Sequence, residues 1–123
     1  MLFDPQKWVM PQIPEVEPEN VPWRKLLLDA ADLIEKKGWC RNAYQTHGRY
    51  CVVGAMSKAL GYKPSICDDL KDDPPLILEA ERHVVAFLNE GRQDERYDSI
   101  PEWNDGQKRG KVVIETLRKV ATS

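Results

Sequence analysis

The chain has 123 residues and a formal net charge of −2, so it has the size of one ordinary domain and lacks the basic excess of a general nucleic-acid binder. It contains no run of about 20 apolar residues that would span a membrane. Asp4, Pro5 and Lys7 interrupt the start too early for a secretion signal. Three cysteines are too few for a disulfide framework, so we expect a cytoplasmic protein with reduced thiols.

Residues 1–21 differ in composition from the rest of the chain. They contain four prolines, which are Pro5, Pro11, Pro14 and Pro18. Because proline fixes φ and disfavours helix at the preceding residue, this segment is predicted to form an extended arm. Trp8 and its apolar neighbours indicate that the arm contacts a surface. That surface is either the protein's own domain or a partner, including a second copy in a homodimer formed through the arm.

Residues 22–123 are predicted to form a single helical domain. The expected fold class is mainly α, a compact bundle of about four helices with a short hairpin-like loop after the first. The first helix begins at Pro22, which suits a first turn, and ends at Gly38, which fits a left-handed cap. The pair His47-Gly48 then supports a tight reversal, and a short helix follows over residues 51–60.

The second half of the domain is predicted to hold two helices joined by a charged loop. Asp73 followed by two prolines is typical of a helix start, and that helix ends near Gly91. Residues 89–104 are rich in charge and are predicted to be loop. The last helix is predicted over about residues 106–121, with Asp105 as its N-terminal cap.

Three short clusters place tryptophan, cysteine and asparagine just outside predicted helix ends. They are Gly38-Trp39-Cys40, then Cys51-Val52-Val53-Gly54-Ala55, then Trp103-Asn104-Asp105 followed by Arg109. Costly or reactive residues in such places indicate either a shared functional site or a shared structural joint between helix ends.

The order and spacing of these clusters resemble a family of small domains, domain-of-unknown-function family 6197 of bacteria and their phages. The resemblance runs over about residues 26–121 and leaves out the N-terminal arm. Members typically have threonine after the arginine, where this chain has Gly110. The resemblance implies a compact, mainly helical domain and no established activity.

Two reactive chemistries are open to the cysteines. A Cys₃His zinc centre would use Cys40, His47, Cys51 and Cys67, but their spacings match no paired zinc knuckle, so no metal site is expected. A thiol enzyme would use Cys51 or Cys40 as nucleophile with His47 or His83 as base, oriented by Asn104 or Asp105. Cys51 is the better nucleophile, because the start of a helix lowers the pKa of a thiol.

A non-catalytic binding module is the favoured hypothesis, without a cofactor. Its predicted contacts are Trp39, Cys40, Arg41, Arg49, Trp103, Asn104, Asp105 and Arg109. Tryptophans stack on planar ligands or anchor interfaces, arginines pair with phosphate or carboxylate, and the amides of a helix that starts at Asp105 bind anions. The expected partner is a protein or a small anionic, nucleotide-like ligand. The phage association of the similar family suggests an inhibitor or sequestering protein.

Overall fold

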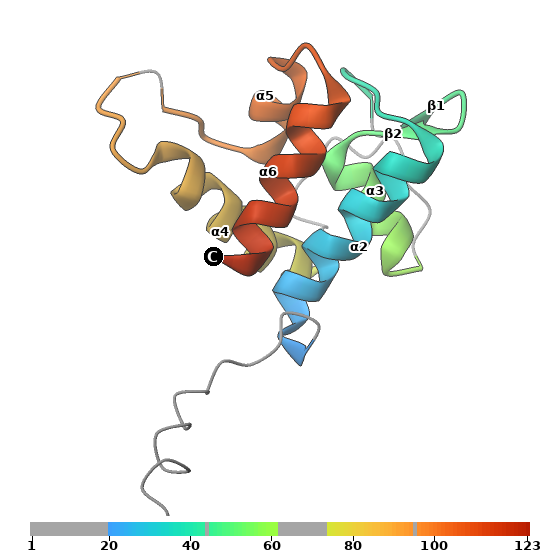
Figure 1. The fold of residues 1–123 in the computed structure, drawn as a ribbon, viewed down its shortest axis with the longest axis horizontal. Helices are drawn as coiled ribbons and strands as arrows, with labels where there is room; N and C mark the ends of the chain where they lie inside the picture. The colour runs from blue at the N-terminus through green and yellow to red at the C-terminus, as the bar shows by residue number, and fades with distance from the viewer. Residues whose placement is uncertain (1–19, 44, 62–73, 95) are drawn as a thin grey trace, which may run out of the picture.

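The computed structural model describes residues 20–43, 45–61, 74–94 and 96–123, which form a mainly α-helical fold, as predicted (Figure 1). This part of the chain contains five helices and one two-stranded sheet. Their bounds are α2 Pro22–Lys37, β1 Gln45–Thr46, β2 Arg49–Tyr50, α3 Val52–Ala59, α4 Pro75–Asn89, α5 Ile100–Asp105 and α6 Gly110–Thr122. The predicted N-terminal arm lies outside the described residues except for Asn20 and Val21.

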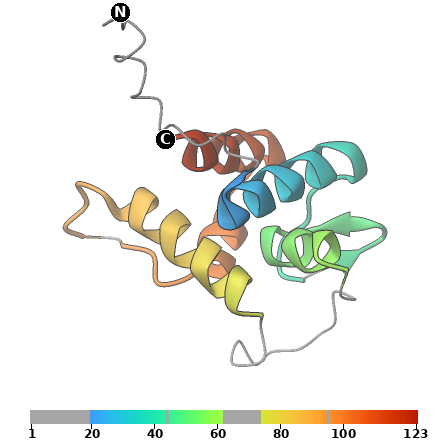
Figure 2. The same ribbon diagram turned by 90° about the horizontal axis from the view of Figure 1, so that it is seen from below.

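Helices α2 and α6 lie side by side and run antiparallel, although they are far apart in the sequence (Figures 1 and 2). Apolar residues at helical spacing form the buried face of α2, which is Leu26, Leu27, Ala30, Ala31 and Ile34. The facing residues of α6 are Val113, Leu117, Val120 and Ala121. Full burial of one aliphatic side chain contributes about 1.5–3 kcal/mol, so this helix pair supplies a large share of the core.

The hairpin after α2 forms at the predicted place. His47 and Gly48 have φ of 50° and 78°, and two consecutive positive φ angles match the right-handed twist of the flanking strands. Gln45 pairs with Tyr50 across the two strands. The chain that leaves α2 adds to this unit, because the Tyr50 amide donates to the Gly38 carbonyl at 3.0 Å.

Helices α3 and α4 start close to their predicted positions. The Cys51 side chain caps α3 by accepting a hydrogen bond from the Gly54 amide at 3.3 Å. Pro74 stands at the cap position of α4, while Asp73, the expected capping residue, lies outside the described residues. Helix α4 buries Ile77, Ala80 and Val84 on the face that meets α2.

The prediction for residues 89–110 was wrong in two respects. A helix, α5, lies within the expected loop, and α6 begins at Gly110 rather than near residue 106. Ser99 caps α5 by accepting from the Glu102 amide at 3.3 Å, and Pro101 suits its first turn. Asp105 therefore ends α5 and does not cap α6, whose N-cap is Arg109.

This arrangement brings four segments of the chain together at one end of the molecule. The end of α2, the hairpin, α5 and the start of α6 all lie at the top of Figure 1. The first and third clusters belong to these elements, and the second begins at Cys51, directly after β2, at the start of α3. Hydrogen bonds of Asn104 to Trp39 and Val52 show that the fold places the three clusters next to one another.

Candidate functional site

Asn104 connects the three clusters. It lies in the last turn of α5, and its side chain is fully buried, with 0% exposure. Its Oδ1 atom accepts from Trp39 Nε1 at 2.9 Å and from the Val52 amide at 3.2 Å. Its Nδ2 atom donates to the Cys40 carbonyl at 3.2 Å and to Asp105 Oδ1 at 3.2 Å. The asparagine amide thus makes four hydrogen bonds to three separate parts of the chain.

A second set of contacts ties the loop after α2 to the connection between α5 and α6. The amide of Asn42 donates to Asp105 Oδ1 at 2.8 Å, and Arg41 donates to the Gln107 carbonyl at 3.0 Å. Asn42 has a φ of 62°, a left-handed conformation that asparagine tolerates better than most residues. Asp105 and Arg41 therefore have structural partners within the protein.

Both described cysteines are buried free thiols. Cys51 is 4% exposed and lies at the start of α3, and Cys40 directs its thiol toward the Ala43 and Arg49 carbonyls. Burial raises the pKa of the Cys51 thiol to about 11 and also raises that of Cys40. The hydrogen bond from the Gly54 amide lowers the pKa of Cys51, but burial is the larger effect. The start of the helix thus lowers this pKa as expected, but burial outweighs it and the pKa is raised overall.

We expect Cys51 to resist alkylation in the folded protein. A rise of the thiol pKa from 9.0 to about 11 reduces the thiolate at neutral pH about 100-fold, because each unit is a factor of ten. Mass spectrometry after iodoacetamide treatment, with and without denaturant, measures this protection. Rapid labelling of Cys51 in the folded protein would contradict the burial argument.

The same pKa shift makes a prediction for alkaline pH. The folded pKa lies above the unfolded one, so the contribution to stability is complete below pH 9 and is lost as pH rises toward 11. Cys51→Ala should remove this part of the alkaline decline in the free energy of unfolding, on the order of 2 kcal/mol.

The two histidines that the thiol-enzyme hypothesis considers as bases contact other residues than the cysteines. His47 is exposed at the hairpin turn, where its Nδ1 lies 3.4 Å from Thr46 Oγ1. His83 stacks on Trp23, with the ring centroids 3.7 Å apart. Within the described ranges, no three His, Cys, Asp or Glu side chains gather as metal ligands would, and Cys67 lies outside those ranges.

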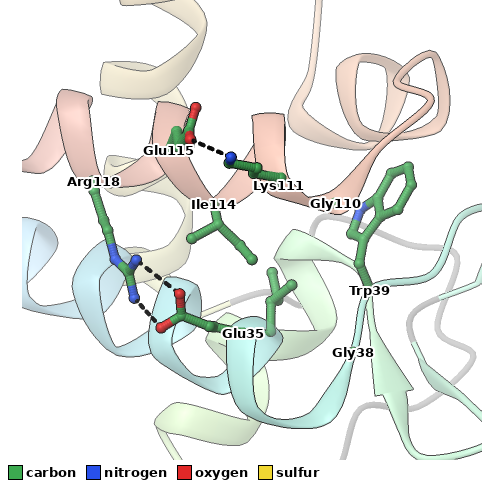
Figure 3. A pocket seen from close by; sticks show the side chains of 9 residues that line it. Glu35, Gly38, Trp39, Gly110, Lys111, Ile114, Glu115 and Arg118 are labelled. Carbon is green, nitrogen blue, oxygen red and sulfur yellow. Dashed lines mark hydrogen bonds and ion pairs between the residues drawn. The ribbon is translucent and has the colours of Figure 1, made fainter.

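The two tryptophans of the clusters have different environments. Trp103 is 3% exposed and belongs to the core, so it is not available to stack on a ligand. Trp39 is half-buried and borders a groove of about 530 Å³ between α2 and α6 (Figure 3). The groove is lined by Ile34, Glu35, Gly38, Trp39, Gly110, Lys111, Ile114, Glu115 and Arg118.

Gly110 allows Trp39 to take this position. A Cβ atom at residue 110 would lie 2.8 Å from the Cβ of Trp39, closer than such atoms approach. The indole therefore packs directly on the first turn of α6. A threonine at this position would not fit here without movement of Trp39.

Charges are distributed unevenly along the groove. At one end, Arg118 pairs with Asp32 at 2.8 Å and with Glu35 at 2.9 Å, and this holds the pKa of the Glu35 carboxyl below its usual range. Lys111 and Glu115 lie 4.0 Å apart on the rim (Figure 3). At the other end, Arg41 lies over the Trp39 ring, with its guanidinium carbon 5.9 Å from the centroid.

Two further arginines, Arg49 and Arg109, adjoin residues that line the groove. The aliphatic part of Arg49 lies against Gly38, where an added Cβ would be 2.9 Å from its Cγ. Arg109 is exposed and directly precedes α6. Arg41 and Arg49 thus contact Trp39 and Gly38, two residues that line the groove, and Arg109 directly precedes Gly110. Cys40, Trp103 and Asn104 are buried.

The sequence did not single out most of the groove residues. Ile34 and Glu35 come from α2, and Ile114 and Arg118 come from α6. The spacing of Gly110, Ile114 and Arg118 at every fourth residue places them on one face of a helix. That spacing is a usable signal, but only the packing of α6 on α2 shows what the face meets.

Comparisons with known proteins identify a family and nothing closer. The model of a family of unknown function (DUF6197) matches residues 18–123. No curated protein and no solved structure matches the chain. In the described residues, none of the helices has the length and apolar character needed to cross a membrane.

Proposed function

This chain belongs to the DUF6197 family, whose function is unknown, and from its geometry we propose that it is a small non-catalytic binding protein. It recognises a protein partner through the groove between α2 and α6. It acts in the cytoplasm, where the free thiols of Cys40 and Cys51 stay reduced. Its role as an inhibitor or sequestering module in phage–host conflict is proposed by analogy.

The fixed position of Trp39 carries this proposal. Its indole N–H is held by Asn104 at 2.9 Å, while the ring borders an open groove. A large side chain that is already oriented loses little conformational freedom when a partner binds. Tryptophans of this kind are enriched among the residues that contribute most to protein interfaces.

The groove offers apolar contact beside this anchor. Ile34 and Ile114 form its floor, and Gly38 and Gly110 contribute no side chains that would fill it. The charged residues lie on the rim (Figure 3). An apolar centre with a charged rim is the usual composition of a protein interface.

A second candidate is a small anionic, nucleotide-like ligand. Arg41 over the Trp39 ring is the observation in its favour, because an aromatic face and a guanidinium together recognise a planar ligand with a phosphate. The first turn of α6 has no acidic residue and no side-chain cap, so its amides are compatible with an anion.

Catalysis by a cysteine is less well supported. Cys51 and Cys40 are buried and their pKa values are raised, whereas a nucleophile needs a populated thiolate. His47 lies exposed on the hairpin turn, and in the described residues its ring makes a hydrogen-bond contact with Thr46 and none with a thiol. These features favour binding over thiol chemistry.

Two matched substitutions on α6 test the protein-binding proposal. Ile114→Glu places a charge on the groove floor, whereas Val112→Glu makes the same change at a position that is 44% exposed and does not line the groove. A bacterial protein that the immobilised wild-type chain captures should bind Ile114→Glu at least about tenfold more weakly. Val112→Glu should bind it normally.

Thermal melts of both variants establish that they are folded, and Lys111→Glu on the exposed rim serves as a milder second variant. Equal binding by all variants would remove the groove from the proposal. A nucleotide panel that raises Tm of the wild type, with no protein captured, would favour the second candidate, because a ligand that binds only the folded state stabilises it.

A further inference from the structure

We infer that the segment of the partner that enters the groove is acidic, with an apolar side chain next to its carboxylates. This inference rests on the proposed function, since it describes the chemistry of what the α2–α6 groove binds. It follows from which charges around the groove are already neutralised within the protein and which are not.

The carboxylates near the groove are committed to neighbours. Asp32 and Glu35 pair with Arg118, and Glu115 lies 4.0 Å from Lys111. Asp105 accepts from the Asn42 amide and from the Asn104 side chain, and it keeps one negative charge that the nearby basic residues outnumber. The α6-centred end of the groove is therefore close to electrically balanced.

The arginines at the hairpin end are not neutralised in this way. In the part of the chain that the structure describes, no carboxylate lies within ion-pair distance of Arg41, Arg49 or Arg109. All three are exposed. Lys36 and Lys37, the exposed last residues of α2, directly precede Gly38, which lines the groove.

This local excess contrasts with the whole chain, whose net charge is −2. Positive charge is therefore concentrated beside Trp39 rather than spread over the surface. A patch of one sign attracts a partner of the opposite sign and accelerates its association. The complementary chemistry at this end is a carboxylate-bearing segment.

The floor of the groove determines the rest of the partner's character. Trp39 and Ile114 present apolar surface, and Arg41 lies over the Trp39 ring. A segment that places one aliphatic or aromatic side chain on this floor brings its neighbouring Asp or Glu residues to Arg41 and Arg49. Carboxylates pair with guanidinium groups in a two-pronged geometry that suits arginine better than lysine.

Nucleic acid fits this surface less well. The acidic residues Asp32, Glu35 and Glu115 lie along the same groove and would face a continuous phosphate backbone. A protein segment can place its carboxylates at the hairpin end alone. A short acidic peptide is therefore the occupant that agrees with both ends of the groove.

Selection from a library of random peptides on the immobilised full-length chain tests this inference. The enriched peptides should carry Asp or Glu next to an aromatic or aliphatic residue. The double variant Arg49→Gln with Arg109→Gln should bind the best of them about fivefold more weakly, since exposed ion pairs contribute modestly. Raising the salt concentration should weaken wild-type binding and affect this variant less.

The control variant is Lys58→Gln with Arg82→Gln, which removes the same charge from exposed positions on α3 and α4 that do not line the groove. It should bind like the wild type. Enriched peptides that are neutral or basic would overturn the inference, as would equal binding by the two double variants.

The failure of this inference differs from the failure of the proposed function. Suppose that the enriched peptides are not acidic but bind the Ile114→Glu variant more weakly than the wild type. The groove would then remain a binding site, and only the acidic character of its occupant would be refuted. No enriched peptide, or peptides insensitive to Ile114→Glu, would refute both. If no peptide is enriched, and nucleotides raise Tm of the wild type but not of an Arg49 variant, the arginines bind phosphate instead of carboxylates.

Discussion

Asn104→Ala should destabilise the protein by about 3–5 kcal/mol, the largest effect that we expect from a single substitution outside the apolar core. The side chain is fully buried and makes four hydrogen bonds. Its removal leaves Trp39 Nε1, the Val52 amide and the Cys40 carbonyl without this partner. Each buried polar group left unpaired costs about 1–3 kcal/mol. Urea unfolding followed by circular dichroism measures the change.

A matched control is Gln93→Ala, at an exposed position in the connection after α4. It should change the free energy of unfolding by less than about 0.5 kcal/mol. A double-mutant cycle of Asn104→Ala with Trp39→Phe, which keeps an aromatic ring but removes the indole N–H, isolates one of the four bonds. A coupling energy near zero, or a loss below about 1 kcal/mol in Asn104→Ala alone, would contradict the role of Asn104 as the connecting residue.

Gly110→Ala should cost about 1–3 kcal/mol, because the new methyl group would lie 2.8 Å from the Cβ of Trp39. Trp39 cannot move away freely, since its indole N–H is bonded to Asn104 and its backbone lies beside β2. The same substitution should weaken binding of any partner that uses the groove, because relief of the clash requires Trp39 to shift. Urea unfolding and the peptide-binding assay measure the two effects separately.

Gly106→Ala is the matched control for this glycine. A Cβ atom there would meet the Glu102 and Trp103 carbonyl oxygens at 3.6 Å, which is ordinary contact. The residue has a φ of −87°, which alanine adopts without strain. This variant should keep the wild-type stability or exceed it by about 0.4–1 kcal/mol. Equal loss in both glycine variants would show that contact with Trp39 is not the cause of the loss at Gly110.

Local sequence signals were sufficient to predict the limits of α2 and of the hairpin, because no other residue nearby indicated a different end. Helix α2 has proline at its start and Gly38 at its end, with a φ of 110°. The hairpin has His47-Gly48 at its turn. In both cases the required backbone angles are properties of a few adjacent residues, so they can be read without knowledge of the fold.

The region of α5 and α6 contained competing signals. Ser99 and Asp105 are both of residue types that cap helices, and the prediction placed Asp105 at the start of the last helix. The structure uses Ser99 to start α5 and lets Asp105 accept from Asn42. The choice depends on Ile100 and Trp103, which α5 buries in the core. Burial of two large apolar side chains outweighs a single capping bond.

The three clusters of tryptophan, cysteine and asparagine have a largely structural role. Cys40, Cys51, Trp103 and Asn104 are buried and hold helix ends together. Of the cluster residues, Gly38 and Trp39 line the groove and Arg109 is exposed. Tryptophan, cysteine and asparagine at helix ends can indicate either a functional site or a structural joint. The burial of each residue shows which of the two explanations applies to it.

The amino-acid sequence by itself determined the helical class, the limits of α2 and the hairpin, and the family, because these follow from backbone preferences and spacing along the chain. Only the tertiary structure decided that Asn104 is a buried connector and that Trp39 borders a groove. Those roles depend on contacts such as that between Trp39 and Asn104, which are 65 residues apart. Packing of α6 against α2 creates the groove, and no local pattern specifies which face of a distant helix will be opposite.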